Sequence, residues 1–342
     1  MAMVSVVALM VAMNASAGDT LKIFTWSEYI DPEVVLEFEE RYDAKLKFTY
    51  FESDQARDEE LALSAGRGFD LIMINDPQID RYARRGWIAP IDEDIVRNMR
   101  HIEDRWRKNF EDDTSYALPY FWGTMGIAYR SDLYPDGFTT WKELLEPAES
   151  LKQKILMVND SRELMGFALK SQGYSANSRN RKEIEEVTQI LRLQKPYVLT
   201  YGYPMLDETS VMLDGTIWAA AMYSGDVLML QEIDDRIVYS LPEEGGLIWA
   251  DYLTVAQSSL NKKLAFEFLN FINEPSIAAR QAEYVYYATP NAAAMELVSQ
   301  EYLDNPVIFP SATDLEKSEY LEPTPPRIRK KINVVGTELF YQ

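Results

Sequence analysis

The sequence predicts an α/β protein made of two doubly wound domains, and three observations support this. The first part of the chain alternates strand-like and helix-like segments, the order that places helices on both faces of a parallel sheet. The 342 residues are 47% apolar, and at this length two domains are favoured over one. The middle of the chain has no Pro/Ser-rich linker, which favours two lobes joined by crossing strands over domains joined by a flexible tether.

The first lobe is expected to begin with strands and helices in alternation. Asp31 and Pro32 supply an N-cap and a first-turn proline for a helix over 33–42. A second helix is predicted over 58–66, ending near Gly66. The predicted strands alternate apolar and polar residues or, in the last case, form the near-continuous apolar run of a central parallel strand: 21–26, 45–51 and 69–76.

The rest of the chain continues the same pattern. Residues 117–130 and 245–255 are predicted as further strands, and 182–196 and 263–275 as amphipathic helices. Residues 323–331, PTPPRIRKK, are predicted as a loop followed by a basic cluster on a terminal helix. That cluster is interpreted as ordinary surface charge, with docking to an acidic partner as the alternative.

The first residues resemble an export signal. An apolar stretch of about a dozen residues ends in Ala15-Ser16-Ala17, the pattern that signal peptidase cleaves. We therefore predict a signal peptide over 1–17 and a soluble exported protein whose mature chain begins near Gly18. The absence of cysteine excludes disulfides and a lipid anchor on cysteine.

Composition argues against several classes of function. A formal net charge of −21 disfavours nucleic acid and anionic membranes as partners. With one histidine, His101, and no cysteine, the chain lacks the ligands of a zinc site and a cysteine nucleophile. Serine-hydrolase, P-loop and dinucleotide-binding motifs are also missing. We expect a binding protein without a cofactor, metal or catalytic residue; a glycosidase using two carboxylates is the alternative from the enzyme class.

Acidic and aromatic side chains meet at breaks in the predicted secondary structure. One such place follows the first strand, where ligands usually bind in α/β folds. It holds four candidate residues: Trp26, Ser27, Glu28 and Tyr29. A second place holds Asp160 and Glu163, three residues apart at a helix start, a spacing that also fits a capping box.

The third place is the strand GGLIWADYLTV, in which Trp249 and Asp251 point to the same face. A buried carboxylate is costly unless a cation or a hydrogen-bond donor meets it. Either nearby backbone amides satisfy Asp251, or a ligand does. A flexible polycation suits all three places, because carboxylates would bind its ammonium groups and aromatic faces would cover its methylenes.

At this point the sequence resembles the periplasmic spermidine/putrescine-binding proteins of ABC importers. The motifs that carry the resemblance occur in the family's order over nearly all of the mature chain: TWSEYIDPE, FDLIM, YFWGTMGIAY, NDSRE, EEGGLIWADYLTV and ATPNAAA. The resemblance implies a two-lobed type 2 clam-shell, each lobe with a doubly wound mixed sheet, joined by crossing hinge strands. It implies lobes of 18–124 plus 252–296 and of 125–251 plus 297–342.

The resemblance also implies a ligand and its contacts. A linear polyamine, namely spermidine, norspermidine or putrescine, would bind between the lobes, with Asp251 holding an ammonium group. Trp26 and Tyr29 would line the first lobe, and Asp160 and Glu163 the second. Two further residues match aromatic positions of the family's pocket: Tyr223 and Tyr287.

The chain departs from the family at two places. Where the family has a serine and then an aromatic residue, Asn75, Asp76 and Pro77 stand here, so that Asn75 is a candidate hydrogen-bond donor and Asp76 a candidate fourth carboxylate. The family's C-terminal glutamine is replaced in the region of Leu321 and Glu322. These changes leave the preferred polyamine open.

The partner is also left open. The resemblance implies a monomer that docks on an inner-membrane ABC permease. The alternative is the norspermidine-sensor branch, whose members bind a membrane signalling receptor that controls cyclic-di-GMP. A ferric-ion carrier is a further alternative, because adjacent tyrosines such as Tyr286 and Tyr287 can ligate iron.

Overall fold

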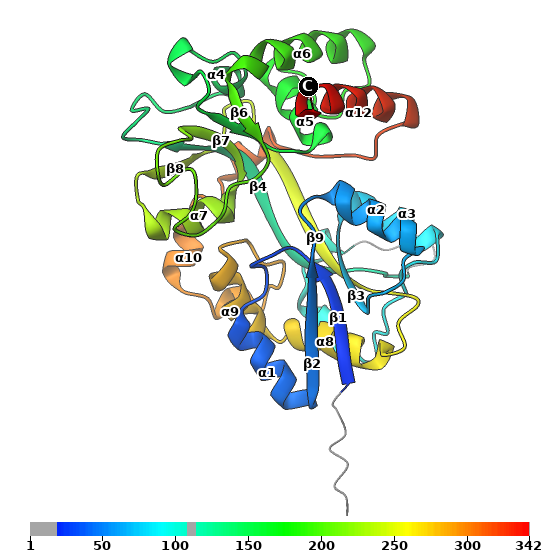
Figure 1. Ribbon diagram of the computed structural model, residues 1–342. Helices are drawn as coiled ribbons and strands as arrows, with labels where there is room; N and C mark the ends of the chain where they lie inside the picture. Colours follow the sequence, from blue (N-terminus) through cyan, green and yellow to red (C-terminus); the bar gives the residue numbers. More distant parts are fainter. Residues whose placement is uncertain (1–18, 108–113, 342) are drawn as a thin grey trace, which may run out of the picture.

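The computed structural model describes residues 19–107 and 114–341 of the chain, and it has two lobes (Figure 1). The predicted signal peptide, 1–17, lies outside the described residues. Among the described residues, the strands form one curled mixed sheet of ten strands in the order β2-β1-β3-β9-β4-β7-β5-β6, with β10 on β9 and β8 on β4. The fold class is therefore α/β with a mixed sheet, as the sequence predicts.

The first lobe contains a parallel group of three strands. β1 (Asp19–Thr25) lies between β2 (Ala44–Tyr50) and β3 (Leu71–Asn75), parallel to both. Its helices are α1 (Pro32–Tyr42), α2 (Asp54–Ser64), α3 (Asp76–Arg84), α8 (Lys262–Ile272) and α9 (Pro275–Val285). Phe38 of α1 contacts Phe268 of α8 at 5.0 Å between ring centroids, so segments far apart in sequence share this core.

The second lobe contains β5 (Ile155–Met157), β6 (Val198–Tyr201), β7 (Ala219–Tyr223) and β8 (Ile237–Ser240). Its longer helices are α5 (Ser161–Ser171), α6 (Arg181–Gln194), α7 (Ser224–Ile233) and α12 (Pro326–Tyr341), with the short α4 (Trp141–Leu145) beside them. Trp141 of α4 stacks on Phe167 of α5 at 4.3 Å in a core separate from that of the first lobe.

Two long antiparallel strands run from one lobe to the other. β4 (Leu118–Arg130) pairs with β9 (Leu247–Val255) through its first part and with β7 and β8 through its last part. β9 in turn pairs with β3 of the first lobe, and its beginning pairs with β10 (Glu319–Tyr320). Figure 1 shows both strands passing between the lobes. These strands are the crossing connections that the sequence predicts.

The lobe boundaries remain a proposal. The predicted first lobe ends at residue 296, but Tyr302 of α10 (Gln300–Asp304) and Ile308 are buried in the first core. We therefore propose that the first lobe continues through Phe309, which packs against the same core. After α11 (Ala312–Glu316), Leu321 packs against the second core.

Capping residues in the sequence predict most of the helix starts to within a few residues. Asp31 caps α1 by accepting a hydrogen bond from the backbone of Glu33 at 2.8 Å, with Pro32 in the first turn. The helix predicted from residue 58 starts four residues earlier, because the Ser53 hydroxyl accepts from the backbone of Ala56 and caps α2 at Asp54. This correction matters for the site, since it places Asp54 at a helix start.

Candidate functional site

Asp251 lies on β9 where the strand passes between the lobes. Its register partners are Asn75 of β3 and Phe121 of β4, and only 7% of Asp251 is exposed. Trp26 Nε1 donates a hydrogen bond to Asp251 Oδ2 at 3.2 Å. Burial, together with the nearby charge of Asp54, raises the pKa of Asp251 to about 7, although Arg57, Tyr29 and Trp26 act in the opposite direction. The fold therefore holds this carboxylate in a place that disfavours its charge.

Trp26 and Tyr29 reach the same place from the loop after β1. The Trp26 ring packs on Phe51 at 4.3 Å, which holds its indole N–H toward Asp251. Tyr29 is 7% exposed, and its hydroxyl lies beside the Asp251 carboxylate. Burial and the charge of Asp251 raise the pKa of Tyr29 well above its usual value, so this hydroxyl stays protonated beside the carboxylate.

Asp160 and Glu163 lie at the start of α5 with different roles. Asp160 is the N-cap: its Oδ1 accepts from the backbone of Arg162 at 2.8 Å and of Glu163 at 3.0 Å. The Glu163 side chain does not complete a capping box. Instead its Oε1 accepts from the hydroxyl of Tyr223 at 2.8 Å. Burial and the charge of Asp160 raise the pKa of Glu163 well above its usual value.

Three aromatic rings form a wall between the lobes. Trp249 lies 4.8 Å from Tyr287 and 5.7 Å from Tyr223, edge to face in both pairs. Tyr223 and Trp249 pack against the cores of both lobes. Gly123, opposite Trp249 on β4, leaves room for the indole, because an added Cβ would lie 2.8 Å from Trp249 Cζ2.

Asp226, at the start of α7, is a carboxylate that the sequence reasoning missed. Tyr203 donates to its Oδ2 at 2.5 Å, and Tyr287 donates to its Oδ1. Burial raises the pKa of Asp226 to about 6, although these two hydrogen bonds lower it. A signal existed: Asp226 closely follows a predicted aromatic residue, Tyr223, at a strand end, the same context in which the other candidates were found.

Asp54, at the start of α2, was also missed. Its Oδ2 accepts from Asn75 Nδ2, and its Oδ1 accepts from the guanidinium of Arg57 at 2.6 Å. Arg57 is fully buried, and it also donates to Asn75 Oδ1 at 3.4 Å. The Asn75 amide is thus turned toward α2, with one hydrogen bond on each side of its amide group.

Three predicted residues are not part of this group in the structure. Ser27 and Glu28 are exposed, and the charge of Glu28 acts on Tyr50 and Tyr284 outside the group. Asp76 is the first residue of α3, and its charge acts on Tyr252 and Tyr320, which are not members of the group.

The remaining residues form one connected group, which we name the interlobe site. Its members are Trp26, Tyr29, Asp54, Asn75, Asp160, Glu163, Tyr203, Tyr223, Asp226, Trp249, Asp251 and Tyr287. Two cations act on its carboxylates. Arg57 is shared with Asp58, and the guanidinium of Arg162 is directed away, donating to Ala176 and Asn177. The five carboxylates thus lack matching positive charge, and the site is suited to a cationic ligand.

The chemistry of the site differs from that of a metal centre. No group of three or more His, Asp or Glu side chains converges as metal ligands in the described part of the chain. The adjacent tyrosines diverge: the Tyr287 hydroxyl binds Asp226, whereas the charges that act on Tyr286 are those of Glu232 and Glu301. This divergence does not favour iron ligation by the pair.

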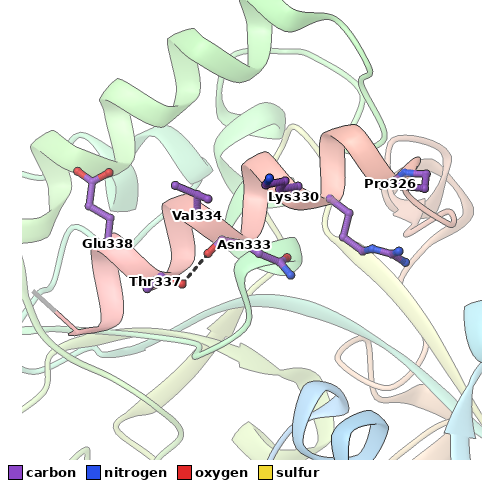
Figure 2. Close-up of a pocket in the computed structure, with 7 residues that line it drawn as sticks. Pro326, Lys330, Asn333, Val334, Thr337 and Glu338 are labelled. Carbon is purple, nitrogen blue, oxygen red and sulfur yellow. Dashed lines mark hydrogen bonds between the residues drawn. The ribbon is translucent and has the colours of Figure 1, made fainter. Parts of the chain in front are cut away.

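A shallow groove also occurs far from these acids, on the exposed side of α12 (Figure 2). Figure 2 shows its residues along one helix, with no converging carboxylates or aromatic rings. They are Pro326, Arg329, Lys330, Asn333, Val334, Thr337 and Glu338. The groove is open, and its helical lining lacks the convergent polar groups of a ligand site. The candidate site is therefore the interlobe site.

Comparisons with known proteins show which family the chain belongs to. Residues 33–310 match the family of bacterial extracellular solute-binding proteins. The chain belongs to this family. This is a family of solute-binding proteins and not of enzymes. Among residues 19–107 and 114–341, every helix falls short of the length and apolarity that a membrane span requires.

Similar proteins were found among curated sequences and solved structures. The spermidine/putrescine-binding periplasmic protein of Salmonella typhimurium is 28% identical over 313 residues, 91% of this chain and 89% of the relative. The putrescine/cadaverine-binding protein of Pseudomonas aeruginosa is 26% identical over 340 residues, 96% of this chain and 95% of the relative. A putative spermidine/putrescine ABC transporter structure from Listeria monocytogenes has a TM-score of 0.85 and 31% identity, covering 94% and 99% of the two chains.

Proposed function

We propose that this solute-binding protein is periplasmic, binds a linear polyamine in the interlobe site, and presents it to an inner-membrane ABC importer. The observation that carries the proposal is Asp251. It is a buried carboxylate whose pKa is raised by burial and by Asp54, and the side chains that donate hydrogen bonds to it, Trp26 and Tyr29, are neutral. An ammonium group would supply the positive charge that this position lacks.

The layout of the site supports a ligand with separated charges. Asp226 lies at one end of the aromatic wall, bonded to Tyr203 and Tyr287. Glu163 lies at the other end, bonded to Tyr223. A chain of methylenes between two ammonium groups matches this order, because its charged ends meet carboxylates while its apolar middle lies against aromatic faces. The polyamine ligands named for the relatives agree with this chemistry.

Ligand binding would stabilise closure of the lobes. One contact already crosses between them: Tyr287 of the first lobe bonds Asp226 of the second. A ligand that neutralises carboxylates of both lobes favours the closed form over the open one, and the importer would recognise that form.

The test is isothermal titration of the mature chain with spermidine, norspermidine, putrescine and a neutral amino acid. We expect at least one polyamine to bind with micromolar affinity or better and the amino acid not to bind. Absence of heat with all three polyamines, from folded protein freed of carried-over ligand, would overturn the proposal. Measuring uptake of labelled polyamine in cells lacking the gene then separates import from sensing, since unchanged uptake would contradict the importer role.

The variant Asp251→Asn tests the central residue. Replacing the carboxylate leaves the ligand ammonium without its partner, so we expect affinity to fall by at least about thirtyfold. The melting temperature of the ligand-free variant should not fall at pH 7.5, because the amide has no charge to desolvate. Normal polyamine binding by this variant would contradict the assignment. Asp235→Asn, at an exposed acid beyond the C-terminal end of α7, is the matched control.

A further inference from the structure

Tyr203 reaches the interlobe site from the segment that follows β6. One residue earlier, the backbone N–H of Gly202 donates a hydrogen bond at 2.9 Å to the carbonyl oxygen of Met157, the last residue of β5. One residue later lies Pro204, which is buried. A residue before proline is restricted to extended backbone conformations. The backbone of Tyr203 is therefore held on both sides by its own lobe.

The Tyr203 hydroxyl connects two groups at the start of α7. Its oxygen accepts a hydrogen bond from the backbone N–H of Tyr223 at 3.1 Å, and it donates to Asp226 Oδ2 at 2.5 Å. Tyr223 lies beyond the pairing of β7 with β5, which extends to Ala220, so a side chain takes the place of a strand partner. Because the oxygen accepts the N–H of Tyr223, its own proton is directed at Asp226.

Asp226 receives a second hydrogen bond of a different kind. Tyr287, which belongs to the first core, donates to Asp226 Oδ1, so this bond crosses between the lobes and is lost when they separate. The bond from Tyr203 lies within the second lobe and does not depend on closure. Each carboxylate oxygen can accept more than one hydrogen bond, so Asp226 keeps capacity for a ligand N–H group on both oxygens.

The hydrogen bonds also act on the charge of Asp226. Burial raises its pKa to about 6, and the bonds from Tyr203 and Tyr287 lower it. Among the described residues, Tyr29 faces Asp226 from the loop after β1, and the charge of Glu163 acts on Tyr203. The pKa values of the three tyrosines are raised well above their usual value, mainly by burial, so their hydroxyls stay neutral and donate at neutral pH.

We propose that Tyr203 is a positioning residue for ligand recognition, which holds the Asp226 carboxylate ready for a ligand ammonium group. The inference rests on the proposed polyamine function and deepens it. A carboxylate that is fixed before the ligand arrives loses less conformational entropy on binding. A donor to a carboxylate also favours its charged form, which is the form that binds an ammonium group. Tyr203 therefore contributes to affinity and sets the pH below which affinity is lost.

The experiment compares Tyr203→Phe with Tyr197→Phe by isothermal titration at pH 6 and pH 8. The ligand is whichever of spermidine, norspermidine and putrescine the wild-type chain binds most tightly. Tyr197 is the matched control, because its hydroxyl also donates to a carboxylate of the second lobe, Glu149 Oε2, at 3.0 Å and outside the interlobe site.

In Tyr203→Phe, we expect affinity at pH 8 to fall about threefold to thirtyfold, the usual effect of a lost hydrogen bond to a charged group. The loss at pH 6 should be larger by at least about threefold. Without the Tyr203 hydroxyl the pKa of Asp226 rises, so more of this carboxylate carries a proton at pH 6 that the ligand must displace. Tyr197→Phe should change affinity less than about twofold at either pH.

Unchanged affinity in Tyr203→Phe would overturn the inference, and so would an equal loss in Tyr197→Phe. A loss that is no larger at pH 6 than at pH 8 would show that Tyr203 only supports the local structure, which also overturns it. Because this comparison sets one variant against itself at two pH values, a small loss of stability does not imitate the expected result. A wild-type chain that binds none of the three polyamines would instead overturn the proposed function.

Discussion

Asp251 and Asp226 carry much of the chemistry of the interlobe site at the scale of single residues. Burial raises the pKa of Asp251 to about 7 and that of Asp226 to about 6. Both values lie far above the ordinary value for aspartate, about 3.9. Each carboxylate is therefore costly to ionise in the ligand-free protein, and each ionises most readily when a cation arrives.

The sign of the resulting pH dependence follows from these shifts. A carboxylate whose pKa is raised on folding reduces stability as pH rises from its unfolded value to its folded value. For Asp251 this window runs from about 4 to about 7. The unfolding free energy of Asp251→Asn minus that of the wild type should therefore increase with pH across this window, by at most about 1.4 kcal/mol per pH unit. Urea unfolding at pH 5, 6 and 7.5 measures the difference, and a gap that does not widen with pH would contradict the assigned pKa.

Polyamine affinity is expected to rise with pH, whereas the stability of the ligand-free wild type falls. Below pH 7 the ligand must displace a proton from Asp251, and below pH 6 from Asp226 as well. Affinity should fall by up to about tenfold per pH unit for each protonated carboxylate. Titration calorimetry in buffers of different ionisation enthalpy should also show proton release at pH 6. Affinity that is constant between pH 5 and 8 would argue against ligand contact with either group.

At the scale of elements, α7 approaches Tyr287 of the first lobe closely, and we expect this approach to matter for closure. Gly225 lies in the first turn of α7, and an added Cβ would be 2.6 Å from Cε1 of Tyr287. Tyr287 belongs to the first core, so this clash arises between the lobes and is relieved when they separate. A side chain at this position should therefore disfavour the closed form without damaging either core.

The variant Gly225→Ala tests this role. Crowding of this kind typically costs 1–3 kcal/mol, about fivefold to a hundredfold in affinity. We expect weaker polyamine binding with a nearly unchanged melting temperature of the ligand-free chain. Gly202→Ala is the matched control, because nothing lies within 4 Å of its added Cβ. If the two variants bind equally well, lobe closure does not bring α7 against Tyr287.

At the scale of the whole molecule, charge steers the ligand. A net charge of −21 attracts a polycation before it contacts the site. The association rate of spermidine should fall about tenfold or more between 10 mM and 300 mM salt, as the screening length shortens from about 30 Å to less than 10 Å. The dissociation rate should change less, since the bound ligand is enclosed. Stopped-flow tryptophan fluorescence measures both rates, and an association rate independent of salt would exclude steering.

The sequence by itself determined the α/β class, the order of the elements and the strand ends that reach the site. Periodicity and caps are local, so Asp31 and Asp160 were recognised as helix starts, and Trp26 and Asp251 as residues at strand breaks. The contacts that these residues make join segments far apart in the sequence, so periodicity and caps could not predict them. The hydrogen bond from Trp26 to Asp251 joins positions 225 residues apart.

Only the tertiary structure decided which acids converge. Asp54 is an ordinary helix-start acid in a chain with 55 acidic residues, and nothing in its own segment distinguishes it. Asp226 is another helix-start acid, and its nearness to Tyr223 was the one local signal for it. Ser27 and Glu28 follow the same strand as Trp26 but are exposed. The physical reason is that helix rotation and strand facing are set by packing between segments distant in sequence. A change of one position along a strand moves a carboxylate from the site to the other face of the sheet.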